Sequence, residues 1–156
     1  MAGASPVQTQ EDLVPPPPAA IGYRLAGVLL APAVAATLHV ILVGPFGIDV
    51  QVPESPGSTT LVSLPLLQTT VVTLVVALAG WLSVMALERF LGPEQGRRIW
   101  TFAAFAVFVL SLAPILPLDV PVEGKWALFV LHLGVAVVLI PTLFNGQAAE
   151  PLHRDT

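Results

Sequence analysis

Four long stretches without a charged residue constrain this chain more than any other feature. They run over residues 25–46, 65–87, 99–118 and 126–144. Each has the roughly 20 residues that a helix, rising about 1.5 Å per residue, needs to cross a hydrocarbon layer about 30 Å thick. Polar residues are too sparse within them to give any stretch a water-facing side. We therefore expect lipid, rather than water, to surround these segments.

The composition agrees with a membrane protein and excludes several other classes. Only 10% of the residues are charged and 55% are hydrophobic, whereas an ordinary soluble domain has about 25% charged residues. The absence of cysteine excludes disulfides and Cys-ligated metal centres. With a net charge of −4, the chain lacks the excess of basic residues that is typical of a nucleic-acid binder. We expect the lipid bilayer as the main partner and no nucleic acid.

The segments are rich in Val, Thr, Ile and Phe, which in water would favour strands. In a bilayer the backbone must hydrogen-bond to itself, so only helices and closed barrels can span it. The apolar runs lack the alternation of a barrel strand, and the short connections make successive helices antiparallel neighbours. The sequence therefore predicts an all-α integral membrane fold, an up-and-down four-helix transmembrane bundle over residues 23–146.

The two ends of the chain are predicted to be tails on the same side of the membrane. Residues 1–22 include four consecutive prolines and offer little apolar surface to bury, so we predict a disordered Pro-rich tail. Residues 147–156 form a second, short tail. Lys125 is the only basic residue expected on the opposite side. Five arginines share the side of the two tails, so the positive-inside rule predicts that both tails face the cytoplasm. These are Arg24, Arg89, Arg97, Arg98 and Arg154.

The connection between the second and third segments, from Glu88 to Arg98, carries both acidic and basic residues. We interpret it as a loop that determines topology. Its cations are also suited to contact anionic lipid headgroups.

Polar side chains inside the spans are the main candidates for function. The two ionisable ones are His39 and His132. Counted at about 1.5 Å per residue, both lie roughly 18 to 21 Å from the inner boundary. One polar residue from each remaining helix falls in the same band. The sequence thus predicts a layer with one polar side chain per helix: His39, Thr73, Ser111 and His132.

Small residues accompany this layer at helical spacing. Gly27, Ala31 and Ala35 share a helix face with His39, and a second small-residue stripe shares a face with Thr73. Small side chains let transmembrane helices approach closely. We therefore predict that both faces point into the bundle, the second one through Ala77 and Gly80.

The prolines indicate where helices bend or stop. Pro32 lies inside the first span and predicts a kink there. Pro114 and Pro117 predict that the third span is broken at its outer end, and Pro65 suits the first turn of the second helix.

The polar layer has two interpretations. Its side chains can hydrogen-bond across helices and fix their register. Alternatively, His39 and His132 bind a haem or a metal, or carry a proton. The chain has no complete catalytic motif. We therefore favour the first interpretation and expect no catalytic residue, cofactor or metal.

Several short motifs stand in the second to fourth segments: Gly80-Trp81, Leu87-Glu88-Arg89, Arg98-Ile99-Trp100, Ser111-Leu112 with Pro114, and Leu131-His132 with Ile140-Pro141. With these motifs the chain resembles a small uncharacterised family of integral membrane proteins from actinobacteria, of the domain-of-unknown-function type. The resemblance implies four transmembrane helices and a plasma-membrane location, and no known activity, substrate or cofactor. Ser111, Pro114 and His132 match the family's pattern, whereas His39 has no counterpart in it.

Three functional hypotheses follow. The favoured one is a non-enzymatic membrane protein with a structural, accessory or interaction role, through self-association or beside a larger membrane protein. The second is a small transporter or proton-linked carrier that uses a polar pocket at Ser111 and His132. The third is a haem or quinone redox protein.

Overall fold

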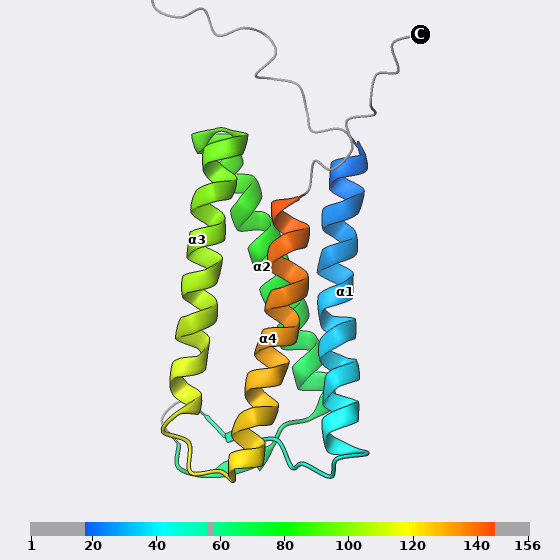
Figure 1. The fold of residues 1–156 in the computed structure, drawn as a ribbon, viewed down its shortest axis with the longest axis vertical. Coiled ribbons are helices and arrows are strands. Elements are labelled where there is room, and N and C mark those ends of the chain that lie inside the picture. The colour runs from blue at the N-terminus through cyan, green and yellow to red at the C-terminus, as the bar shows by residue number, and fades with distance from the viewer. Residues whose placement is uncertain (1–17, 56–57, 146–156) are drawn as a thin grey trace, which may run out of the picture.

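Four long helices account for most of the structure. The computed structural model describes residues 18–55 and 58–145. The helices run up and down, antiparallel to their neighbours in the chain (Figure 1). All four are long and apolar enough to cross a membrane, as the sequence predicts. They are α1 (Pro18–Val43), α2 (Leu66–Leu91), α3 (Pro93–Leu112) and α4 (Val122–Phe144).

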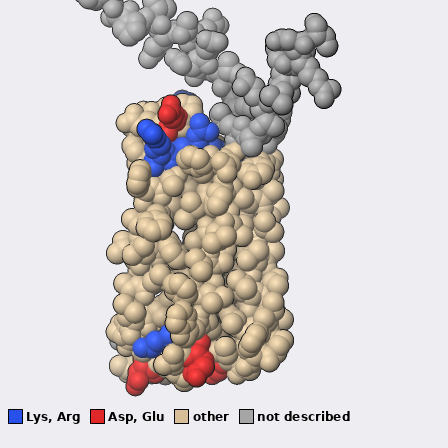
Figure 2. All heavy atoms as spheres, in the orientation of Figure 1, with Lys and Arg blue, Asp and Glu red and all other residues tan. Residues whose placement is uncertain are grey.

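The helices form a square in which chain neighbours lie side by side. α1 packs against α2 and α4, and α3 packs against the same two helices, while α2 and α4 also touch across the diagonal. Charged side chains gather at the two ends, and an uncharged band separates them (Figure 2). That band is the surface that a bilayer would cover.

Helix bounds differ from the prediction at the start of α1 and between α2 and α3. α1 begins at Pro18, so residues 18–22, predicted as part of the tail, are helical; residues 1–17 and 146–156 lie outside the described structure. The expected loop from Glu88 to Arg98 is also helical, apart from Gly92. Charge marks where a helix leaves lipid, not where it ends, because Glu and Arg are good helix formers in water.

The turn between α2 and α3 is a single residue. Gly92 has φ of +83°, a conformation that glycine adopts readily and that other residues rarely take. Pro93 follows at the first position of α3, where its missing N–H removes no helical bond. This turn belongs to the end of the bundle that holds Arg24, which we call the Arg24 end.

At the end of the bundle opposite Arg24, the third span is broken at Pro114, as the sequence predicts. α3 stops at Leu112 and a short 3-10 turn, η2 (Ala113–Ile115), follows through Pro114. Pro65 stands just before α2 rather than in its first turn, with an extended backbone. α1 continues through Pro32 to Val43.

A small β-hairpin, which the sequence analysis missed, lies between α1 and α2. β1 (Gln51–Pro53) pairs antiparallel with β2 (Leu61–Ser63), with Gln51 opposite Ser63. Val50, just before β1, is fully buried among side chains of η2 and α4. The hairpin segment therefore closes this end of the bundle, which we call the hairpin end.

The Asp49 carboxylate helps to fix the hairpin end. Hydrogen bonds from Ser63 and from Gln51 hold the pKa of this carboxyl below its ordinary value, because they stabilise the charged form. The Gln51 amide donates to it at 2.7 Å.

The core has two parts along the bundle axis. Towards the Arg24 end, small and large side chains interlock around Val28, Ala77, Trp100 and Leu143. Towards the hairpin end, Val50 packs with Ile115 and with residues of α4. Within the four uncharged segments, the outward face carries no charged side chain, as lipid contact requires.

Candidate functional site

The predicted small-residue stripes lie at helix interfaces. A Cβ on Gly27 would overlap the Thr142 side chain of α4, so glycine is what allows α1 and α4 to approach at this point. Ala31, Ala35 and Ala77 are fully buried. Gly80 faces Leu143 of α4, with a Cβ position 3.4 Å from it.

Close contacts between helices show at what height along the bundle axis the residues of the predicted polar layer lie. On α4, Thr142 faces Gly27 and Gly134 faces Leu38. This antiparallel register puts His39 level with residues 131–132 of α4. His39 and His132 thus share a level on neighbouring helices.

The other two helices agree with this level. Thr69 of α2 touches His39, and Thr73 lies one turn further along α2. On α3, Trp100 pairs with Ser83 of α2, a register that puts Ser111 near residue 72. The four candidate side chains therefore come from a single band of the bundle.

Within that band, His39 makes a contact between helices. Its side chain is only 5% exposed, and its Nδ1 lies 3.1 Å from the Thr69 hydroxyl oxygen. The same hydroxyl lies 3.3 Å from the Pro65 carbonyl, to which it donates. In that arrangement Nδ1–H donates to Thr69, since the hydroxyl has a single proton. The Thr73 hydroxyl donates to the Thr69 carbonyl at 2.8 Å, so Thr73 bonds to the backbone of its own helix.

Ser111 and His132 bond within their own helices instead. The Ser111 hydroxyl donates to the Phe108 carbonyl at 2.7 Å. His132 Nδ1 lies 2.7 Å from the Leu128 carbonyl. A carbonyl only accepts, so Nδ1 carries the proton, and Nε2 of the neutral ring has a free lone pair. The four residues share a level without forming one network.

A buried ion pair at the Arg24 end was not predicted. Arg24 of α1 is 5% exposed, and its guanidinium donates to both carboxylate oxygens of Glu88 of α2, at 2.7 and 2.5 Å. Arg97 of α3 approaches the same carboxylate, with its Nε 3.8 Å from Oε1. One carboxylate thus joins three helices. Opposite charges at the start of the first span and the end of the second, which an antiparallel pair brings together, are the signal that could have revealed it.

The start of α3 is held tightly against α2 beside this ion pair. A Cβ on Gly96 would lie 2.6 Å from the backbone nitrogen of Glu88, so only glycine allows this approach. One turn later the indole of Trp100, itself buried, donates to the Ser83 hydroxyl at 2.9 Å. The α2–α3 pair is therefore closely packed near its turn.

Comparison with known proteins places the chain in a family. The model of DUF6069, a family of unknown function, matches residues 15–149. The chain belongs to the DUF6069 family. This confirms the expected membership of an uncharacterised family, whereas the actinobacterial association stays a prediction. No curated protein and no solved structure matches the chain.

The matched DUF6069 region contains all four helices and the hairpin. The Arg24–Glu88 ion pair and the polar band both fall inside it. Among residues 18–55 and 58–145 of this DUF6069 protein, no three His, Asp or Glu side chains are grouped so that they could hold a metal ion.

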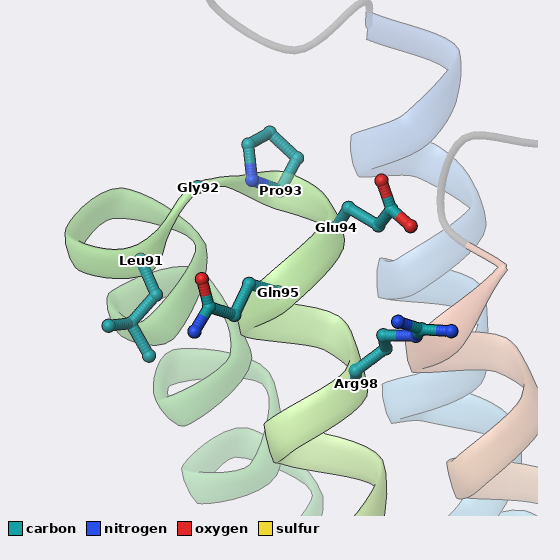
Figure 3. Close-up of a pocket in the computed structure, with 6 residues that line it drawn as sticks. All are labelled: Leu91, Gly92, Pro93, Glu94, Gln95 and Arg98. Carbon is teal, nitrogen blue, oxygen red and sulfur yellow. The ribbon is translucent and has the colours of Figure 1, made fainter.

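A shallow depression lies at the α2–α3 turn of the DUF6069 fold (Figure 3). It is lined by residues of the turn and the first turns of α3, with Glu94 and Arg98 extending to the same side of that helix. None of the four predicted polar residues borders it.

Proposed function

We propose that this protein is a non-enzymatic, multi-pass membrane protein whose bundle has a structural, accessory or interaction role. The observation that carries this proposal is how the polar side chains of the spans are used. His39 meets Thr69, Ser111 and His132 bond to their own backbones, and Glu88 is held by Arg24. These groups therefore either join neighbouring helices or form hydrogen bonds with the backbone of their own helix.

The energetics support an architectural role. A hydrogen bond between transmembrane helices contributes about 0.6 kcal/mol on average, but a polar group left unpaired in lipid costs several kcal/mol. Polar residues with such partners are therefore tolerated and fix the register of the helices. The rigid bundle would then present its apolar outer face to lipid, to a second copy or to a larger membrane protein.

We further propose that the Arg24 end faces the cytoplasm in the plasma membrane. Among the described residues, this end carries four arginines and two acidic residues. The hairpin end has one lysine, Lys125, and four acidic residues. The excess of basic residues marks the cytoplasmic side under the positive-inside rule.

A proton-linked carrier is the second candidate, and one observation favours it. His132 is half-buried at the level of Ser111, with Nε2 not used by its hydrogen bond to Leu128. Against it, Val50 and Ile115 are buried at the hairpin end, between these residues and that side of the membrane. A carrier would have to displace this apolar closure in each cycle.

Two measurements on the purified full chain test the choice. The favoured role predicts an absorption spectrum without a Soret or quinone band. It also predicts equal proton flux for wild type and His132→Leu in liposomes. A Soret band from bound haem, or a pH-dependent flux that His132→Leu abolishes, would overturn the proposal. Thr142→Val on the same helix is the matched control for the flux.

A further inference from the structure

Basic side chains surround the α2–α3 turn at the Arg24 end of the molecule (Figure 2). Arg89 lies in the last turn of α2, and Arg97 and Arg98 lie in the first turns of α3. Arg89 and Arg98 are exposed, and Arg97 is half-buried. We call these three residues the basic patch.

The backbone holds the basic patch in a fixed place. Gly92 reverses the chain in one residue, and Gly96 brings α3 against the backbone of Glu88. The Nε–H of Arg97 donates to the Pro93 carbonyl at 3.0 Å, which ties that side chain to its own helix. The backbone positions of the patch are therefore set before a charged group binds, and binding has to order only the arginine side chains.

Nearby carboxylates balance the three positive charges of the basic patch only in part. Glu94 lies one turn before Arg98 and extends to the same side of α3, and it offsets one charge at most. Both oxygens of Glu88 are engaged by Arg24, so Arg97, at 3.8 Å, shares a carboxylate that is already neutralised. Within the described part of the chain, neither Arg89 nor Arg98 has a carboxylate oxygen within 4.0 Å. The patch therefore keeps a net positive charge.

The patch also stands where lipid headgroups would lie. Phe90, next to Arg89, is 81% exposed, and Phe102, one turn after Arg98, is 79% exposed. Large apolar side chains in such exposure face hydrocarbon in a membrane-spanning helix. The arginines next to them are thus at the boundary between hydrocarbon and water.

We propose that the basic patch binds the phosphate of anionic phospholipids, such as phosphatidylglycerol, with Arg89 and Arg98 as the direct contacts. The planar guanidinium fork matches two phosphate oxygens at once, and the charge of an anionic headgroup complements the patch. This inference is independent of the architectural role of the helix interior.

The test measures lipid retention by the full chain in detergent, by native mass spectrometry. Phosphatidylglycerol and phosphatidylcholine with the same acyl chains are added at equal concentration. We expect a clear excess of bound phosphatidylglycerol, because only its headgroup carries a net negative charge. Use of the full chain includes any competition from acidic residues in the tails.

The variants locate the site. At low salt, Arg98→Gln should lower phosphatidylglycerol binding about fivefold, and adding Arg89→Gln should lower it by about the same factor again. Lys125→Gln, at the hairpin end, is the control for loss of a positive charge elsewhere. It removes the hydrogen bond from Lys125 to the Leu116 carbonyl but should leave phosphatidylglycerol binding unchanged. Neither arginine makes a hydrogen bond with a described residue, so both variants should keep the wild-type melting temperature.

Three results would overturn the proposal. The first is equal retention of both lipids by the wild type. The second is phosphatidylglycerol binding that survives in the Arg89→Gln, Arg98→Gln variant. The third is complete displacement of the lipid by millimolar inorganic phosphate, which would show a site for a free anion instead.

Discussion

The α1–α2 and α3–α4 pairs carry polar residues at the same level of the bundle but use them differently. Between α1 and α2, His39 meets Thr69 near the hairpin end, and Arg24 meets Glu88 at the other end. Between α3 and α4, Ser111 and His132 each bond to their own helix. Depth in the membrane therefore does not decide what a polar residue does. Its role depends on the helix face on which it lies and on the residue opposite that face.

The same contrast distinguishes the two ends. The Arg24 end is joined by charge, with one carboxylate between arginines of two other helices. The hairpin end is closed by apolar packing of Val50 on η2 and α4. Substitutions should therefore have graded effects, largest where the contact crosses helices and is charged.

The largest effect is expected for Glu88→Gln. Removing one partner of a buried ion pair leaves the charge of Arg24 uncompensated, which costs about 3 kcal/mol. The free energy of unfolding, measured by denaturing-detergent titration in mixed micelles, should fall by about that amount. Glu94→Gln, an exposed acidic residue on α3, is the control and should stay near the wild type. Equal stability of the two variants would show that the pair does not hold α1.

The next effect tests close approach between helices. Gly96→Ala places a Cβ against the backbone of Glu88, which cannot rotate away, so α3 must shift. Overpacking of this kind costs about 1 to 3 kcal/mol. Gly22→Ala, where a Cβ meets nothing within 4 Å, is the matched control. The same titration should separate the two, and a neutral Gly96→Ala would contradict the observed packing.

A smaller difference is expected between the two histidines. His39→Leu removes the bond to Thr69 between α1 and α2, and should destabilise the protein by about 1 kcal/mol. His132→Leu removes a bond within α4 only, so its effect should stay within about 0.5 kcal/mol. If His132→Leu were the more damaging of the two, His132 would have a partner that this account lacks.

The smallest effect concerns Asp49 and pH. Because hydrogen bonds lower its pKa below the ordinary 3.8, its contribution is complete above that value and is lost as the pH falls through the lowered pKa. Stability should therefore decline on acidification, and Asp49→Asn should weaken that decline. The decline can be followed by hydrogen exchange of the hairpin amides between pH 6 and pH 2. An identical decline in Asp49→Asn would exclude this carboxylate as its source.

Much of the fold could be predicted from the sequence because the solvent imposes it. Four uncharged runs of sufficient length can only be helices in a bilayer, and this holds whatever their side chains pack against. The helix ends were less predictable. Glu88 and Arg89 stand where α2 leaves lipid, but the helix continues to Leu91, because neither residue interrupts it.

The sequence predicted the depth of the polar residues in the membrane but not the residues with which they form hydrogen bonds. Counting residues brought His39, Thr73, Ser111 and His132 to one band. It could not show that Thr69 rather than Thr73 would face His39. The two threonines share one face of α2 and differ by one turn along it, and the axial register of two helices to within one turn is a packing outcome. The Arg24–Glu88 pair depends on residues 64 apart in the chain, and only the antiparallel arrangement of α1 and α2 brings them together.

A double-mutant cycle on Arg24 and Glu88 tests most directly whether polar contacts between helices hold the bundle together. The single variants Arg24→Gln and Glu88→Gln and their combination are compared with the wild type by free energy of unfolding in mixed micelles. We predict that the double variant is markedly less destabilised than the sum of the two singles, with a coupling energy of at least about 1 kcal/mol. Strictly additive effects would contradict the account, because they would mean that the two side chains do not interact in the folded protein.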